Sequence, residues 1–180
     1  MESIFSLTDH EIYAITAKHN DSSSAMIATW VIPATLVATR PRIVAAISSQ
    51  NYTYQLIRKS KQFACQLLSE NQFELVTKLG LYSGSVKKKL DDVETSDTVR
   101  GNTVIKGTCG WCDCRVIDMM DSGDRMIILA DVLDSVVKKN HTPLRKKQAF
   151  EKLSAKDREL LLEKRENDAK RDAKLIKLFE

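Results

Sequence analysis

The sequence predicts a mainly β fold of the α+β class, built as an antiparallel barrel or sandwich of six or seven short strands. Short apolar runs recur along the first 137 residues, and turn-forming residues separate them. Only two short helices are expected between the runs, too few for the repeated strand–helix–strand units of a doubly wound sheet. The turn-like Asp121-Ser122-Gly123-Asp124 separates the last two runs and predicts a hairpin.

The first two expected strands carry most of this prediction. Glu11 to Ala17 is apolar on both faces, as a central strand would be. Met26 to Ile32 is a continuous apolar run that follows the polar turn Asn20 to Ser24 and stops at Pro33, so we expect one buried strand there. Further strands are expected at Arg42 to Ile47, Phe63 to Leu68, Cys109 to Met119 and Met126 to Leu133.

Two helices and one long loop lie between these strands. Helical spacing of apolar residues predicts one helix from Tyr52 to Ser60 and another from Phe73 to Leu79, which Gly80 ends. From Ser83 to about Lys106 the sequence is polar and predicts a loop.

The chain divides into a main domain, residues 1–137, and a basic, mostly helical C-terminal extension, residues 138–180. The main domain holds 14 Lys and Arg against 16 Asp and Glu, whereas the extension holds 14 against 8, so the net charge of +4 comes from the extension. Ser154 and Asp157 resemble a capping box, and Glu166 and Lys170 form an i,i+4 pair. Because its charges alternate in sign, we expect a solvated helix that packs on a dimer partner rather than a nucleic-acid footprint.

The composition favours one soluble domain. With 180 residues, 43% of them hydrophobic, the chain can bury one sizeable core. No run reaches the ~18 apolar residues that a membrane span needs, and the first residues lack the basic segment and apolar core of a secretion signal. A cytoplasmic protein without a membrane partner is therefore expected.

The four cysteines do not suggest a disulfide scaffold. Cys65 is isolated, and Cys109, Cys112 and Cys114 have the spacing Cys-x2-Cys-x-Cys with no fourth ligand close by. Alternation along a strand also puts Cys109 on the face opposite the other two. Reduced, buried thiols are expected, and no metal site.

Five segments in order resemble the flavin reductase-like proteins, which have the FMN-binding split β-barrel. The segments are Met26 to Pro33, Ile43 to Thr53, Ser83-Gly84, Trp111 to Val116 and Gly123-Asp124-Arg125. No single segment is decisive, and it is their number and order that carry the resemblance. It covers about residues 9 to 136 and implies the split form of the antiparallel barrel.

The resemblance implies that FMN binds without covalent attachment at a homodimer interface. Backbone amides of the segment before Pro33 would donate hydrogen bonds to the edge of the flavin ring. Hydroxyl groups at the exit of the third strand, amides at the start of the first helix and a second loop that carries a Lys would bind the phosphate. The implied cofactor-binding residues are Ala28, Thr29, Trp30, Val31, Ser48, Ser49, Asn51, Tyr52, Thr53, Ser83, Gly84 and Lys89.

Several residues near this site have two interpretations each. Trp30 is either a core residue or a wall of the flavin pocket. Arg125 stands where the family's flavin reductases commonly have a His near the flavin ring. Since an Arg does not exchange protons near neutral pH, Arg125 would hold an anionic partner or negative charge on the ring, or it is simply a surface cation. Two of the three residues Lys87, Lys88 and Lys89 are expected on a solvated face.

Three functions remain open. The first is an FMN-dependent oxidoreductase in which NAD(P)H reduces bound or free flavin. The second is an FMN-binding electron-transfer protein that serves a redox partner protein and has no nicotinamide site, which the missing His favours. The third is a non-enzymatic binding module that uses the basic extension. The sequence does not decide between NADH and NADPH, nor between FMN as a bound group and FMN as a substrate.

Overall fold

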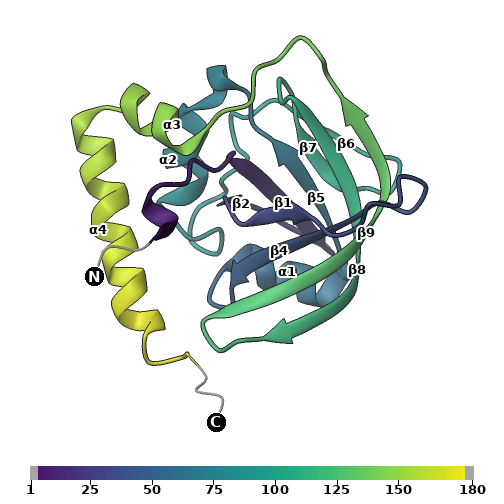
Figure 1. Cartoon of the computed structure of the whole chain (residues 1–180), viewed down its shortest axis with the longest axis horizontal. Helices are drawn as coiled ribbons and strands as arrows, with labels where there is room; N and C mark the ends of the chain where they lie inside the picture. The colour runs from purple at the N-terminus through teal and green to yellow at the C-terminus, as the bar shows by residue number, and fades with distance from the viewer. Residues whose placement is uncertain (1–3, 177–180) are drawn as a thin grey trace.

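The protein, in a computed structural model that describes residues 4–176, folds around one curled antiparallel sheet (Figure 1). Within this range seven strands form the sheet in the order β2-β1-β5-β8-β9-β4-β3. The strands of this sheet are β1 Tyr13–His19, β2 Ser22–Ala28, β3 Val31–Pro33, β4 Arg42–Ser48, β5 Gln62–Leu67, β8 Gly110–Asp121 and β9 Arg125–Val137. The helices are η1 Ile4–Ser6, α1 Tyr52–Ser60, η2 Glu70–Gln72, α2 Glu74–Gly80, α3 Lys146–Lys152 and α4 Ala155–Asp172. The predicted fold class is confirmed.

The two ends of the sheet are joined by only two residues. β2 and β3 lie at opposite ends of the strand order, yet only Thr29 and Trp30 separate them in the chain. The Trp30 carbonyl accepts a hydrogen bond from the Ala46 N–H at 3.0 Å, so this residue already belongs to the β3–β4 end. The sheet therefore curls into a half-barrel. The prediction of one strand from Met26 to Ile32 is wrong, because the chain stops pairing with β1 after Ala28 and then pairs with β4.

Apolar side chains are buried on both faces of the sheet. Strands from both ends of the order, together with α1, contribute to one cluster that includes Ile15, Phe63 and Ile128, which places this cluster inside the half-barrel. A second cluster contains Ile12 and Ala14 with residues of α2 and α3. Because β1 and the residue before it supply both clusters, the prediction of a strand that is apolar on both faces is confirmed.

The first helix has the predicted bounds, and local contacts explain both of its ends. The Asn51 side chain accepts a hydrogen bond from the Thr53 N–H at 2.9 Å, which caps the N-terminus of α1. Lys61, with a φ of 58°, ends the helix in the left-handed conformation. The second predicted helix is also present, as α2, and Gly80 is its last residue.

The predicted loop from Ser83 to Lys106 contains a short second sheet. β6, Thr95–Asp97, pairs with β7, Thr103–Ile105. This hairpin is tied to the main sheet, because the buried Asp113 carboxylate in β8 accepts hydrogen bonds from the Thr98 hydroxyl and the Asn102 amide, both at 2.6 Å. Strands of three residues carry too little alternation to be predicted from the sequence.

The predicted hairpin near the end of the main domain is the longest feature of the sheet. β8 pairs with β9 with two irregularities in register, and Gly123 adopts a φ of 97° in the connecting turn, a conformation that favours glycine. Cys112 and Cys114 pack against the cluster inside the half-barrel, whereas Asp113 points to the opposite face, as alternation predicts.

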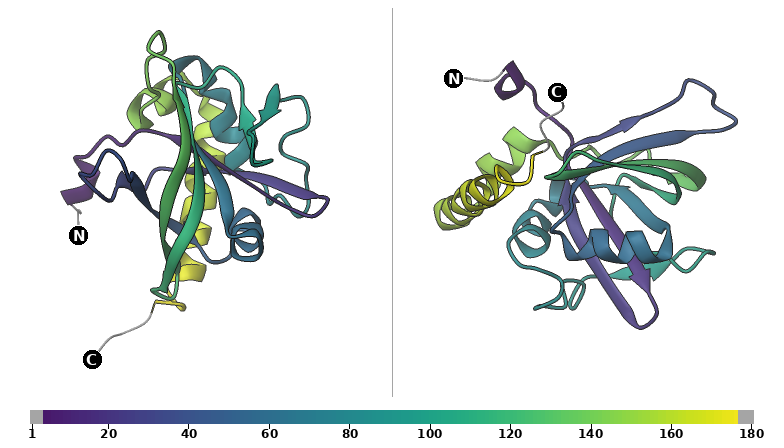
Figure 2. Two further views of the ribbon diagram at one scale, coloured as in Figure 1. Left: turned by 90° about the vertical axis from the view of Figure 1, so that its right-hand side faces the viewer. Right: turned by 90° about the horizontal axis from the view of Figure 1, so that it is seen from below.

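The C-terminal segment packs on its own chain. Leu144, Ala149 and Leu153, on or beside α3, belong to the second apolar cluster. Beyond them α4 runs along one side of the molecule, in contact with α2 and away from most of the sheet (Figure 2). Contact of α4 with a dimer partner stays a prediction, and so does the domain boundary at residue 137.

Two local predictions for α4 are confirmed. The Ser154 hydroxyl oxygen accepts a hydrogen bond from the Asp157 N–H at 3.1 Å and caps the helix. Lys170 Nζ lies 2.7 Å from Glu166 Oε1. None of the helices within residues 4–176 is both long and apolar enough to cross a lipid bilayer.

Candidate functional site

Two adjoining cavities lie where the half-barrel, the end of α2 and the C-terminal helix α4 meet. The smaller has a volume of about 150 Å³ and the larger a volume of about 310 Å³. They form one continuous depression, because they share the lining residues Ser48, Asn51, Gly80, Lys164 and Asp168. Together they reach the size of an ordinary small-molecule site, which is roughly 300–1,000 Å³.

The connection between β4 and α1 lines both cavities. Ser48 ends β4, and its hydroxyl oxygen accepts a hydrogen bond from the Gln50 N–H at 3.3 Å. Asn51 and Tyr52 then begin α1 beside the smaller cavity. Because the first N–H groups of a helix lack partners within the helix and carry partial positive charge, this end of the depression suits an anion.

The break between β2 and β3 lines the larger cavity. Ala28, Thr29 and Trp30 all contribute to it. Trp30 is 52% exposed and lies under the guanidinium of Arg125, whose Cζ is 5.5 Å from the centre of the ring. Of the two interpretations of Trp30, the structure supports a pocket wall rather than a core position.

Lys89 is a buried cation beside the smaller cavity. Lys87 and Lys88 are exposed, as expected for two of the three lysines, whereas Lys89 is 4% exposed and its Nζ donates a hydrogen bond to the Leu79 carbonyl at 2.6 Å. Burial lowers the pKa of Lys89 to about 8, and the nearby Lys164 ammonium contributes to this shift. An anion in the cavity would therefore stabilise the charged form of Lys89.

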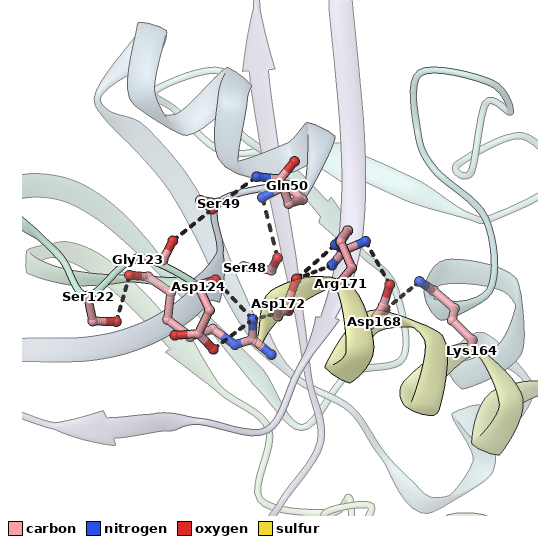
Figure 3. Close-up of polar contacts among 11 residues, drawn as sticks. Ser48, Ser49, Gln50, Ser122, Gly123, Asp124, Lys164, Asp168, Arg171 and Asp172 are labelled. Atoms are coloured by element: carbon pink, nitrogen blue, oxygen red, sulfur yellow. Dashed lines mark hydrogen bonds and ion pairs between the residues drawn. The ribbon is translucent and has the colours of Figure 1, made fainter. Parts of the chain in front are cut away.

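Helix α4 supplies the opposite wall with one carboxylate held between two cations. Asp168 Oδ2 lies 2.7 Å from Lys164 Nζ, and Asp168 Oδ1 lies 2.8 Å from Arg171 Nη1. Figure 3 shows this arrangement close to the β4–α1 connection, with Gln50 and Ser48 across from Arg171. All three α4 residues line the smaller cavity.

Arg125 is held by a carboxylate from the end of α4. Its Nη1 lies 2.6 Å from Oδ2 of the buried Asp172, and Asp172 Oδ1 also pairs with Arg171 Nη2 at 2.6 Å. Burial alone would raise the pKa of Asp172, but the hydrogen bonds from Arg125 and Arg171 outweigh it and hold that pKa below its ordinary value. Arg125 is therefore an oriented cation at the larger cavity and not an isolated surface charge.

The structure brings most of the predicted site residues to the depression. Those that line it are Ala28, Thr29, Trp30, Ser48, Asn51, Tyr52, Ser83 and Lys89, together with Arg125. Four predicted residues do not line it: Val31, Ser49, Thr53 and Gly84. Their predicted part in cofactor binding stays a prediction.

Each of these four residues is next in sequence to a residue that lines the depression. Val31 contributes to the inner apolar cluster. The hydroxyl of Ser49 donates a hydrogen bond to the Gly123 carbonyl at 3.4 Å, and the buried Thr53 hydroxyl donates to Ser24 Oγ at 3.0 Å. A Cβ on Gly84 would overlap this same Ser24 hydroxyl.

Sequence reasoning missed the contribution of α4. Lys164, Asp168 and Arg171 are spaced i, i+4 and i+7, which puts them on one face of a helix. That spacing was a signal for a shared face, but it did not show which surface the face meets. Gln50, Gly80 and Tyr82 in the same lining were also not predicted.

The residues present fit a flavin mononucleotide. Five cations surround the depression: Lys89, Arg125, Lys164, Arg165 and Arg171. Three carboxylates accompany them, Asp168 in the lining and Asp124 and Asp172 against Arg125. The excess of two positive charges matches the charge of about −2 on a phosphate monoester. The larger cavity adds an exposed Trp and the small Ala28 for an aromatic ring.

The cysteines lie apart from this depression. All four are free; Cys65, Cys109 and Cys114 are buried, and Cys112 is partly exposed. Burial raises the pKa of the Cys65 and Cys114 thiols, which keeps them protonated. Within residues 4–176 there is no group of three or more His, Cys, Asp or Glu side chains placed to hold a metal ion.

Comparison with known proteins points to one family. Residues 5–153 match the model of the flavin reductase-like domain. A protein of Nostoc sp. named diflavin flavoprotein A 6 is 28% identical over 119 residues, which are 66% of this chain and 20% of that protein. The chain thus spans about a fifth of the length of this relative.

Solved structures agree on the fold. The NADH:FAD oxidoreductase SgcE6 of Streptomyces globisporus superimposes with a TM-score of 0.72 at 16% identity, over 79% of this chain and 84% of that one. An FMN-binding protein of Thermus thermophilus superimposes with a TM-score of 0.70 at 16% identity, over 78% of each chain. Because the family model matches most of the chain and the split-barrel topology agrees, the chain belongs to the flavin reductase-like domain family.

Proposed function

We propose that this protein is a flavoprotein that binds FMN in the depression between the half-barrel and α4 and passes electrons from NAD(P)H to it. One observation carries the proposal: a depression lined by eight of the residues expected to contact FMN also has two more cations than carboxylates around it. Family membership and the flavin named for each of the two solved structures support the same cofactor class.

The two cavities would hold the two ends of the cofactor. The flavin ring would lie in the larger cavity against the β2–β3 break, where the small Ala28 lets it approach the backbone. The phosphate would lie in the smaller cavity beside Ser48, Ser83 and Lys89. When bound, FMN supplies the capacity to accept a hydride from NAD(P)H, and the chain contributes orientation and electrostatics.

Arg125 would act on the ring end through its charge. A guanidinium stays protonated at any physiological pH, so Arg125 does not serve as a general acid. Its place over Trp30 lets it stabilise negative charge on the ring or on an anionic partner. The bond to Asp172 fixes its orientation.

A homodimer with FMN at the interface remains part of the proposal. Several large apolar side chains are exposed, among them Trp30 at the larger cavity, Ile32 in β3 and Met120 in β8. A second copy of the chain would cover such side chains. Sedimentation with and without FMN measures whether the dimer forms.

Titration of the purified chain with FMN tests the binding proposal. We expect FMN to bind with quenching of its fluorescence, and Lys89→Met to weaken binding about tenfold, because it removes a buried cation beside the phosphate. Lys88→Met changes the exposed neighbouring lysine and should leave FMN binding unchanged. A wild-type chain that binds neither FMN nor riboflavin would refute the proposal.

Rapid mixing of the FMN-loaded protein with NADH or NADPH separates the enzyme from an electron carrier. Fast loss of the visible absorbance of the oxidised flavin is expected for the enzyme. The second candidate, an electron-transfer protein without a nicotinamide site, is favoured by Arg125 in place of the His. It predicts no loss with either nucleotide and reduction only by a reduced partner protein.

A non-enzymatic binding module is the remaining alternative. It predicts a colourless protein that takes up no flavin and, for a nucleic-acid ligand, a gel shift that persists above physiological salt. Two of the three α4 cations that line the depression, Lys164 and Arg171, are paired with Asp168 and Asp172, which leaves fewer of them for such a partner.

A further inference from the structure

Helix α4 lies outside the part of the chain that matches the family, yet it lines both cavities of the depression. The family match ends at residue 153, and α4 begins at Ala155. Lys164 and Asp168 line both cavities, Arg165 lines the larger and Arg171 the smaller. This chain therefore has a wall at the depression that the matched domain itself does not supply.

Helix α4 contributes few side chains to the interior of the protein. Asp172 is the one residue within α4 that is buried, and Leu160 and Leu162 are 37% and 52% exposed. Leu161 packs at the edge of the second apolar cluster, facing Gly80. The charged face toward the depression is therefore not explained by apolar packing of the helix.

The charges on this face of α4 are arranged so that an anionic ligand can replace a carboxylate as the partner of two cations. Asp168 is the shared partner of Lys164 and Arg171, at 2.7 and 2.8 Å. In the lining of the same cavity, the Lys89 ammonium donates a hydrogen bond to the Leu79 carbonyl. Three cations thus face the smaller cavity with one carboxylate between them.

We propose that α4 forms one wall of the phosphate subsite, in which Lys164 and Arg171 bind the FMN phosphate and Asp168 pairs with these two cations only until the phosphate replaces it. This inference rests on the proposed function and adds residues to its site. The phosphate, with three acceptor oxygens and a charge of about −2, replaces Asp168 as the partner of both cations. The subsite then consists of Ser48, Ser83 and Lys89 on one side and α4 on the other.

Comparison of FMN with riboflavin isolates the phosphate contribution. The two flavins share the ring and the ribityl chain, so the dissociation constant of riboflavin divided by that of FMN measures what the phosphate adds to binding. We expect Lys164→Gln to weaken FMN binding about tenfold and Lys164→Gln/Arg171→Gln further, with riboflavin binding unchanged in both. Lys170 lies on the same helix, pairs with Glu166 and does not line the depression, so Lys170→Gln is the matched control.

A second variant makes the inference falsifiable even if the double variant is poorly folded. Asp168→Asn removes the carboxylate that competes with the phosphate, so we expect tighter FMN binding and unchanged riboflavin binding. The inference is overturned if Lys164→Gln keeps the wild-type ratio, if it weakens both flavins equally, or if Asp168→Asn weakens FMN. Failure of the proposed function looks different, because the wild-type chain would then bind neither flavin.

Discussion

The half-barrel and α4 are held in place by different kinds of interaction. In the half-barrel, Ile15, Phe63 and Ile128 are fully buried, and they come from strands that are distant in sequence. In α4, only Asp172 is buried along 18 residues, and the helix is attached through the ion pair of Asp172 with Arg125 and through Leu161 at the edge of the second apolar cluster. Apolar burial fixes the shape of the half-barrel, whereas the position of the helix depends largely on paired charges.

This difference assigns different tasks to the two regions. A buried large apolar side chain contributes about 1.5–3 kcal/mol through the hydrophobic effect, whereas an exposed ion pair contributes about 0–1 kcal/mol. Substitutions in the half-barrel should therefore act on folding. Substitutions in α4 should act mainly on the charges that face the depression, with small effects on the free energy of unfolding.

The largest expected effect is the loss of a core side chain. Phe63→Ala empties space inside the half-barrel and should lower the free energy of unfolding by about 3–5 kcal/mol. Leu162→Ala, on an α4 residue that is 52% exposed, should change it by less than about 0.5 kcal/mol. Urea unfolding of both variants makes the comparison. Equal losses would mean that α4 belongs to the folding core after all.

A smaller effect on the free energy of unfolding is expected at Gly84, which lies in the loop after α2 and in contact with the half-barrel. In Gly84→Ala the new Cβ would overlap the Ser24 hydroxyl and lie 3.2 Å from Tyr52 Cδ1, so the buried Ser24–Thr53 hydrogen bond must shift. We expect a loss of about 1–3 kcal/mol in the free energy of unfolding, measured by urea unfolding.

The control for this variant lies at the boundary with α4. A Cβ on Gly80 would meet Leu161 Cδ2 at 3.7 Å and Ile27 Cγ1 at 3.8 Å, which are ordinary contacts. Gly80→Ala should therefore be neutral or slightly stabilising in a helix. If Gly80→Ala were the more destabilising of the two, the boundary between α2 and α4 would be the tighter packing.

The fold could be predicted from the sequence wherever periodicity or a cap marks an element. Tyr52–Ser60 was found with its bounds, because its apolar spacing and the polar residues before it agree. The break at Thr29 and Trp30 could not be found, because neither residue is a turn former and the apolar run continues through it. The second strand ends where its pairing with β1 stops at Ala28, and β3 begins where Val31 pairs with Ala45 of β4.

Only those site residues that belong to the family motifs could be predicted from the sequence. The hydroxyl and lysine positions Ser48, Ser83 and Lys89 came from the family resemblance, and all three line the depression. Lys164 and Arg171 lie in a helix whose composition resembles any solvated charged helix. Which face of such a helix meets the protein depends on contacts between segments far apart in sequence, and those leave no local signal.

The next smaller effect concerns the attachment of α4. Asp172→Asn removes one of the two carboxylate partners of Arg125 and one of the two of Arg171, and should lower the free energy of unfolding by about 1–2 kcal/mol at neutral pH. Because the pKa of Asp172 is held below its ordinary value of 3.8, this contribution is present above that pH and is lost as the pH falls below it.

Urea unfolding of wild type and Asp172→Asn at several pH values measures this dependence. The difference between the two proteins should be constant from neutral pH down to about pH 5 and should shrink below about pH 4. A difference that grows in acid would mean that Asp172 is destabilised by its burial, and that other contacts hold the helix.

The smallest expected effect links the two regions through Lys89. Because burial and Lys164 lower the pKa of Lys89 to about 8, the flavin-free protein loses this positive charge as the pH rises through that value. The FMN phosphate keeps its charge of about −2 above about pH 6. We therefore expect FMN to bind about threefold more weakly at about pH 9.5 than at about pH 7.

Two controls isolate Lys89 as the cause. Riboflavin has the same ring, so ionisation of the ring affects both flavins. The dissociation constant of riboflavin divided by that of FMN therefore reports on the phosphate alone. In Lys89→Met this ratio should be smaller than in the wild type at neutral pH and should no longer change with pH. A ratio that still falls in Lys89→Met would assign the titration to another group at the depression. A ratio independent of pH in the wild type would mean that the pKa of Lys89 is the same in the free and the FMN-bound protein, and hence that its ammonium group does not interact with the phosphate.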